Sequence, residues 1–129
     1  MTTKATLRLF AVGAALALFL VACGGSDDSG GSYKPPTGPA VAKVDLESGN
    51  FYFKPKQVDS SPAGITAVTL KNQGGLHDLV IRDVPGFQIE VSGSDEVTEK
   101  VDLAKGKYEF YCTIPGHEEA GMKGTLTVS

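Results

Sequence analysis

The sequence has little of what metal centres are built from: two histidines, two cysteines and two methionines in 129 residues. It lacks an apolar run long enough to cross a membrane as a helix, since residues 9–22 make up about fourteen residues and about 20 are needed. Basic residues are not in excess, because the formal net charge is −3. It becomes −5 without the first 22 residues, which carry Lys4 and Arg8 and no acid. These absences argue against a spanning helix, a nucleic-acid partner and a polybasic membrane patch.

Residues 1–22 have the pattern of a secretory signal peptide, with two basic residues before the apolar run. The residues that follow, Leu20-Val21-Ala22-Cys23, resemble a bacterial lipobox, in which cleavage before the cysteine leaves its thiol and amine to carry lipid. A plain signal peptide or an uncleaved anchor is the alternative. Two or three acyl chains are sufficient for stable anchoring. We therefore expect an extracytoplasmic, periplasmic protein that the lipidated Cys23 anchors to the cell membrane.

Residues 23–40 consist almost entirely of Gly, Ser, Asp and Pro and have little to bury. They predict a flexible linker, stiffer near its prolines, with a root-mean-square span of roughly 20–25 Å. The remaining residues, 41–129, are enough for one domain with a modest two-layer core. The predicted division is a signal peptide over 1–22, a lipid-anchored linker over 23–40 and a folded domain over 41–129.

From residue 41 onward, turn residues separate short stretches in which apolar and polar residues alternate. These residues have no helical period of useful length and no internal repeat. Pro55 limits the second stretch, which we expect to be an edge or bulged strand. Together they predict an all-β fold, an antiparallel Greek-key sandwich of seven or eight strands. The expected strands are 41–47, 50–53, 65–71, 77–82, 87–91, 97–103, 107–112 and 122–128.

Side chains two residues apart along a strand share a face. This alternation places His77, Cys112 and Met122 on the apolar faces of their expected strands. His117 belongs to a loop instead. A metal at one end of the sandwich, under that loop, would contact all four residues. The residues that share a face are Tyr108, Phe110 and Cys112; His77, Leu79 and Ile81; and Met122, Gly124, Leu126 and Val128.

Residues 112–122, CTIPGHEEAGM, bring a thiol, an imidazole and a thioether within eleven residues. One Cys and two His with a weak axial Met form the blue-copper electron-transfer site, so we predict one copper bound by His77, Cys112, His117 and Met122. Zinc is the rival metal, but structural zinc sites use four Cys or His ligands. A Cys-His hydrolase is the rival chemistry. It needs a thiol in electropositive surroundings or at a helix N-terminus, and a third group that orients the His.

The same loop resembles that of the cupredoxins, the family of plastocyanin, azurin, halocyanin and auracyanin. Residues 72–81, NQGGLHDLVI, resemble the family's first histidine strand, and residues 102–112 resemble its approach to the cysteine. The resemblance covers about residues 40–129. Four residues separate Cys112 from His117 and four separate His117 from Met122, a spacing nearer to that of auracyanin than of plastocyanin. It implies a cupredoxin-like fold and a monomer whose partners are cytochromes or membrane electron-transfer complexes.

Asp78 stands where the family often has Asn, a residue that ties the histidine strand to the residue after the cysteine, here Thr113. A carboxylate can accept hydrogen bonds in such a tie but cannot donate as an amide does. A solvated Asp78 is therefore the alternative to a tie. Asn72, Gly74 and Gly75 are typical turn residues, with closeness to the metal as a second interpretation.

The function expected from these features is that of a membrane-tethered carrier of single electrons through Cu(I) and Cu(II), and not an enzyme. A nitrite reductase or laccase needs further histidines, and a binuclear oxidase centre needs two cysteines in the loop. An extracytoplasmic copper carrier or storage lipoprotein is the alternative. The edge of the His117 ring, beside small and apolar residues such as Leu76 and Ala120, is the expected exit for the electron.

Overall fold

The first strand shows why this chain forms sheets. Along β1 (Ala42–Gly49), the apolar Ala42, Val44 and Leu46 are buried, while the charged Lys43 and Asp45 are exposed. That alternation is the period of two that a strand with one buried face requires. The computed structural model describes residues 32–129, and within that range it has nine strands. The other eight are β2 (Tyr52–Lys54), β3 (Gln57–Ser61), β4 (Gly64–Asn72), β5 (Leu76–Ile81), β6 (Gln88–Ser92), β7 (Glu96–Leu103), β8 (Gly106–Tyr111) and β9 (Lys123–Val128).

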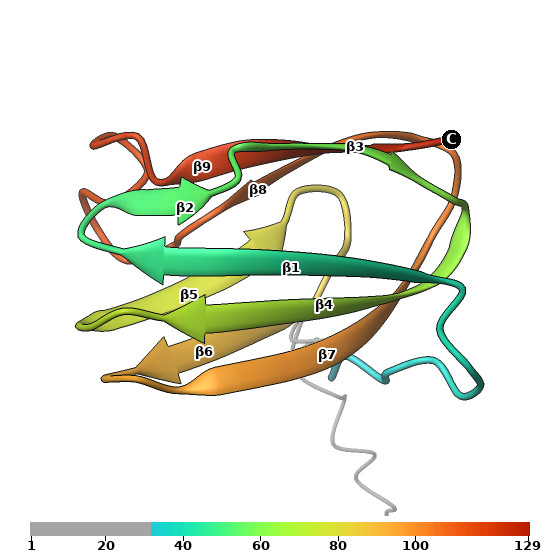
Figure 1. The fold of residues 1–129 in the computed structure, drawn as a ribbon, viewed down its shortest axis with the longest axis horizontal. Coiled ribbons are helices and arrows are strands. Elements are labelled where there is room, and N and C mark those ends of the chain that lie inside the picture. Colours follow the sequence, from blue (N-terminus) through green and yellow to red (C-terminus); the bar gives the residue numbers. More distant parts are fainter. Residues whose placement is uncertain (1–31) are drawn as a thin grey trace, which may run out of the picture.

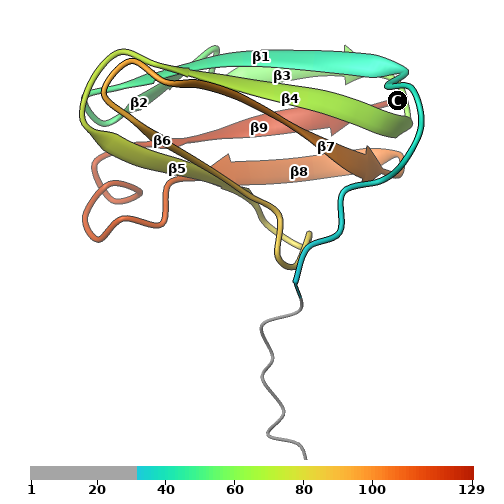
Figure 2. The same cartoon turned by 90° about the horizontal axis from the view of Figure 1, so that it is seen from below.

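The strands form two sheets that pack face to face, with the orders β2-β1-β4-β7 and β3-β9-β8-β5-β6 (Figures 1 and 2). The predicted all-β sandwich is therefore confirmed. It differs from the prediction in two respects: β3 was not expected, and both sheets are mixed because β1 pairs with β4, and β3 with β9, in parallel. β2 is an edge strand, as Pro55 had indicated.

The core lies between the two sheets and is built from the inward faces of both. Phe53 of β2 and Phe110 of β8 meet edge to face, with ring centroids 5.6 Å apart. Leu70 of one sheet and Leu79 of the other are fully buried. Burying a side chain of this size stabilises the fold by about 1.5–3 kcal/mol. The inward face of β5 therefore carries its histidine into a packed interior.

Several connections between strands meet at one end of the sandwich, at the left of Figure 1. Asn72, buried at the end of β4, holds three of them together. Its side-chain amide donates hydrogen bonds to the backbone oxygens of Gly75 and Gly93, at 2.9 and 3.0 Å, and its oxygen accepts one from the Ser48 hydroxyl at 2.8 Å. Each polar atom of this buried amide has a hydrogen-bond partner, so this one side chain fixes how the three segments lie relative to one another.

β5, which carries His77, and β8, which ends directly before Cys112, share only a short ladder. β5 pairs with β8 at Val80 with Tyr111 and at Ile81 with Phe110. Toward the ligand end, β5 continues to pair with β6, from Val80 to Leu76. The ladder between β5 and β8 thus stops short of the end where the connections meet.

Residues before β1 also contact the sandwich. The Tyr33 ring packs edge to face on Phe87, with centroids 5.4 Å apart, and its hydroxyl donates to the Lys100 backbone oxygen at 2.6 Å. Part of the segment expected to be linker, from Tyr33 on, therefore lies against the domain. The predicted signal peptide and Cys23 fall outside the described residues. Across residues 32–129, no helix has the length and apolarity needed to cross a bilayer.

Candidate metal centre

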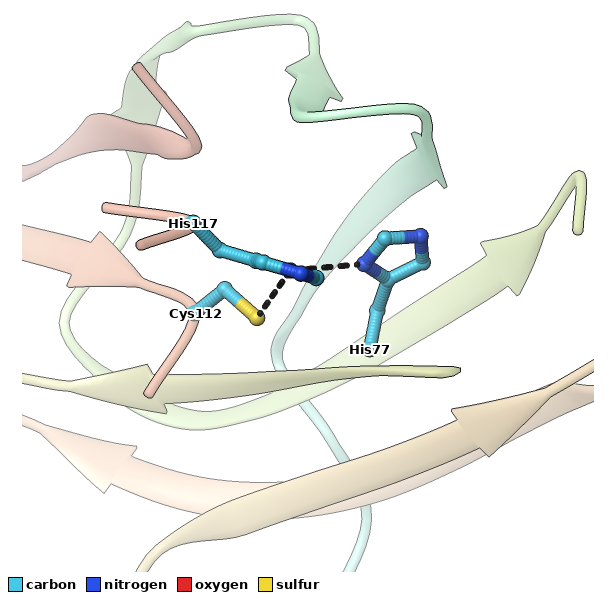
Figure 3. A group of neighbouring side chains, drawn as sticks. All are labelled: His77, Cys112 and His117. Carbon is cyan, nitrogen blue, oxygen red and sulfur yellow. Dashed lines mark hydrogen bonds between the residues drawn. The ribbon is translucent and has the colours of Figure 1, made fainter. Parts of the chain in front are cut away.

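His77, Cys112 and His117 converge at the end of the sandwich where the connections meet. Their candidate ligand atoms all lie within 4.8 Å of one another. The Nδ1 atoms of the two histidines are 3.3 Å apart, and the Cys112 Sγ is 3.4 Å from the His117 Nδ1. Figure 3 shows the three side chains directed toward a common point from β5, from the end of β8 and from the connection after it. The sequence prediction had placed these residues at one site.

The connection between β8 and β9 folds back on itself and so brings its ligands together. Cys112 donates from its backbone N–H to the Met122 oxygen at 3.1 Å, and Met122 donates to the His117 oxygen at 2.9 Å. His117 donates in turn to the Ile114 oxygen at 3.0 Å. Gly116, directly before His117, has φ of 85°, a conformation that a residue with a side chain rarely adopts.

Three of the four predicted ligands are buried, and burial shifts the pKa values of two of them. His77, Cys112 and Met122 are 4%, 1% and 0% exposed, whereas His117 is half-buried. Burial, and then the nearby His117, lower the pKa of His77, so that its ring is neutral and able to bind a metal. Burial raises the pKa of the Cys112 thiol. An activated nucleophilic cysteine has a lowered pKa, so this cysteine does not fit the hydrolase alternative.

The chemistry of the donor set fits copper. Two imidazole nitrogens and a sulfur face one another, and the fourth residue, Met122, is completely buried and hydrogen-bonded through its backbone to Cys112 and His117. A thioether suits copper, whereas structural zinc is bound by four Cys or His ligands. His77, Cys112, His117 and Met122 would therefore hold the ion.

Asp78 is tied to the ligand connection. Its carboxylate accepts hydrogen bonds from the Thr113 backbone N–H at 2.6 Å, from the Thr113 hydroxyl and from the Gln88 side-chain amide at 2.8 Å. Asp78 is only 4% exposed, so of the two alternatives drawn from the sequence the structure has the tie and not a solvated carboxylate. Burial alone would raise the pKa of Asp78, but the hydrogen bonds from Thr113 and Gln88 leave it below its ordinary value.

Phe51 is a site residue that the sequence did not indicate. It lies in the turn between β1 and β2 with φ of 61°, which is unusual for a bulky side chain. Its ring is 44% exposed and stands edge-on to the His117 ring, with centroids 5.0 Å apart. An aromatic residue directly after the turn residues Gly49 and Asn50 was the available signal, but the sequence placed it in the expected strand 50–53, whereas β2 begins at Tyr52. Its place against His117 depends on the three-dimensional meeting of two loops.

Part of the predicted surroundings of His117, the small and apolar residues from Gly74 to Leu76, lines one surface cleft with it, together with the polar Asn50 and Gln73; Ala120 is not in this lining. Leu76 is 63% exposed, and the same surface cleft is lined by Phe51, Gly74, Gly75, Leu76, Ile114 and His117. The acidic residues beside it are not equivalent. Glu118 is paired with Arg82 at 3.0 Å, and Arg82 also pairs with Glu109. Glu119 is exposed.

The fold and the donor set together define a small copper-binding β-sandwich protein. Residues 40–129 match the family described as copper binding proteins of the plastocyanin/azurin family, and the chain belongs to that family. His77, Cys112, His117 and Met122 form its type 1 copper site. Membership supports copper-based electron transfer as the general function.

Plastocyanins of other organisms are similar in sequence. The plastocyanin of Dryopteris crassirhizoma is 33% identical over 105 residues, which cover 67% of this chain and 99% of the relative. The chloroplastic plastocyanin of Physcomitrium patens is 34% identical over 100 residues, which cover 70% of this chain and 58% of the relative. Among solved structures, the dithionite-reduced auracyanin of Roseiflexus castenholzii is 25% identical with a TM-score of 0.60, over 70% of this chain and 99% of that one.

Proposed function

We propose that this protein carries single electrons between redox proteins and is not an enzyme. The observation that carries the proposal is the group of three ligand atoms within 4.8 Å, enclosed except at the half-buried His117. When bound, copper supplies a one-electron couple between Cu(I) and Cu(II). An enclosed donor set with one side chain near the surface suits electron exchange better than substrate binding.

The residues of the chain have distinct parts in this function. Cys112 and Met122 are held in the core, so a change of oxidation state would need little rearrangement of the protein. His117 stands at the surface between Phe51 and the exposed Leu76, where a partner can approach closely without desolvating charge. Small, weak interfaces of this kind suit short-lived redox encounters.

The visible absorption spectrum of the copper-loaded chain tests the proposal. Bound Cu(II) should give an intense band from charge transfer between the Cys112 thiolate and copper. Cys112→Ser should abolish the band while circular dichroism shows that the variant remains folded. A folded wild-type protein that binds Cu(II) and stays colourless would exclude the blue-copper function. Storage or delivery of copper, the alternative, is not favoured, because ligands this deeply buried do not suit ready release to another protein.

We also propose that the protein works outside the cytoplasm, tethered to the cell membrane by lipid on Cys23, with cytochromes or membrane electron-transfer complexes as partners. The support is the sequence of residues 1–23, with its basic start, apolar run and lipobox-like end. Intact mass of the mature protein tests it: wild type should begin at Cys23 and carry lipid, and Cys23→Ala should remain unprocessed. A wild-type protein without lipid, beginning at another residue, would contradict the tether.

A further inference from the structure

Asp78 is a buried acid at a position where the strand pattern alone would leave it exposed. It follows the inward-facing His77 on β5, so it faces the outer side of its sheet. Its cross-strand partner on β6 is Glu90, which is exposed to solvent. Asp78 nevertheless has 4% exposure. Two carboxylates thus lie opposite each other, one in water and the other removed from it.

The partners of Asp78 are hydrogen-bond donors and not cations. A backbone N–H can only donate, and the Thr113 N–H is directed at one carboxylate oxygen; the Thr113 hydroxyl and the Gln88 amide reach the other. The ion pairs found within residues 32–129 both involve Arg82, with Glu109 and Glu118 as partners. The negative charge of Asp78 is therefore solvated by dipoles but is not neutralised by an opposite charge.

This charge lies next to two copper ligands. Asp78 follows His77 directly in the chain and is hydrogen-bonded to Thr113, which directly follows Cys112. A negative charge in a poorly solvated place acts strongly on neighbouring charges, because little water screens it. It favours whichever state of a neighbouring site is more positive. Cu(II) carries one more positive charge than Cu(I).

We propose that Asp78 tunes the copper site by its charge, and that its carboxylate stabilises Cu(II) relative to Cu(I) in addition to tying β5 to the ligand connection. The inference rests on the proposed function, because it concerns the same copper couple. An asparagine at this position could provide a tie without the charge. Asp78 is thus a positioning residue that also sets the redox balance of the site.

Asp78→Asn separates the charge from the tie. The variant keeps a side-chain oxygen for the Thr113 N–H, and Gln88 can turn its amide so that its own oxygen accepts. We expect the ratio of Cu(II) to Cu(I) affinity to fall by about tenfold. For a one-electron couple that raises the reduction potential by about 59 mV. The matched control is Glu90→Gln, which removes the same charge from the facing but exposed position and should leave the potential unchanged because water screens it.

Two further measurements address the charge and the tie without the copper couple. Asp78→Asn should weaken binding of divalent Zn²⁺ more than binding of monovalent Ag⁺, each relative to wild type, because loss of a nearby negative charge costs a doubly charged ion more. Hydrogen exchange of the Thr113 amide in the metal-free protein should stay slow in Asp78→Asn, which shows that the tie remains. If Asp78→Asn fails to fold, Asp78→Ser provides a second neutral variant with the same expected direction.

The outcomes separate this inference from the proposed function. A coloured wild type and a coloured Asp78→Asn with equal potentials would overturn the role of the charge and leave the electron carrier standing. An equal rise in Glu90→Gln would also overturn it, because the effect would then come from net charge and not from the buried position. Loss of the coloured site in wild type itself would count against the proposed function instead.

Discussion

The rings of Phe51 and His117 meet at an interplanar angle of 86°, so the edge of one is directed at the face of the other. This is a favoured geometry for aromatic pairs. The backbone of Phe51 is held at φ of 61°, a conformation that costs a bulky residue about 1–3 kcal/mol and persists only where the surroundings hold it. Phe51 and Leu76 are two exposed apolar residues of the surface cleft that His117 also lines.

A negative charge in place of either Phe51 or Leu76 should slow electron exchange between two copies of the protein. Phe51→Asp and Leu76→Asp each place a carboxylate where two copies must touch, and its desolvation should slow self-exchange by about tenfold, which corresponds to about 1.4 kcal/mol. Line broadening in mixtures of reduced and oxidised protein measures the rate. Val41→Asp is the control, since Val41 is 59% exposed but precedes β1, at the opposite end of that strand. Unchanged exchange in both variants would place the exit elsewhere.

Met122 would supply the weakest donor of the copper site, and this donor tunes the reduction potential. Met122→Gln should keep a coloured site and lower the reduction potential, because an oxygen donor favours Cu(II). Met122→Leu should raise it, because no donor remains. Voltammetry of the two variants measures both shifts. If the potentials move in the same direction, Met122 serves as packing and not as a ligand.

At the level of single residues, the sequence indicated the ligands and some of their neighbours, such as Thr113 and Leu76, but not Phe51 or Gln88. His77 and Cys112 share strand faces with apolar residues, so alternation alone placed them at one end of a core. Phe51 has no such pattern, since its orientation follows from a turn with positive φ. The hydrogen bonding of the buried Asp78 depends in part on Gln88. Gln88 belongs to another strand, and only the sheet pairing shows that it lies nearby.

Among the elements, β4 and its last residue organise the end that holds the site. Asn72 links the end of β1, the turn after β4 and the turn after β6 through one side chain. The turn after β4 leads directly to His77, and Gly75 in it adopts φ of 79°. A methyl group at Gly75 would lie 3.2 Å from the His77 Nε2, so the turn and the ligand are closely packed.

Asn72→Ala should therefore destabilise the whole domain. It leaves the buried Ser48 hydroxyl without its acceptor and removes one hydrogen bond each from the Gly93 and Gly75 backbone oxygens, of which the Gly75 oxygen keeps the Gly93 N–H. A buried polar group left without a partner costs about 1–3 kcal/mol. We expect the free energy of unfolding to fall by at least about 2 kcal/mol in chemical denaturation of the metal-free protein. Gln73→Ala, an exposed neighbour in the same turn, should change it by less than about 0.5 kcal/mol. Similar values for the two variants would show that Asn72 does not hold the turns.

The sequence predicted most strands but not the sheet they form. β3 has the sequence QVDSS, in which one apolar residue is too little for a period, so alternation could not detect it. The parallel pairs of β1 with β4 and of β3 with β9 join strands distant in sequence, and the pattern within a strand does not report its partner. Turn residues between strands favour hairpins, and this led to the expectation of antiparallel sheets.

In the molecule as a whole, β5, which carries His77, and β8, which leads to the other three ligands, are neighbours whose shared ladder ends early, at Val80 with Tyr111. Beyond that point the Asp78 carboxylate, and not a sheet ladder, joins β5 to the connection after β8. In the metal-free protein this connection should open at a lower free energy than global unfolding, because opening it breaks few backbone hydrogen bonds. Copper uptake should then be faster than global unfolding. Stopped-flow absorption measures the first, and denaturant jumps measure the second.

A distant core variant distinguishes local from global opening. Leu103→Ala, in a residue that is 1% exposed at the end of β7 and pairs with Gly64 at the start of β4, should lower the free energy of unfolding by about 2–5 kcal/mol. It should leave the rate of copper uptake unchanged. Uptake that accelerates together with unfolding would mean that the metal enters a largely unfolded chain. If copper enters by local opening beside the short ladder between β5 and β8, folding and copper binding are separate steps in time. A chain that has folded without copper can then still acquire the ion later.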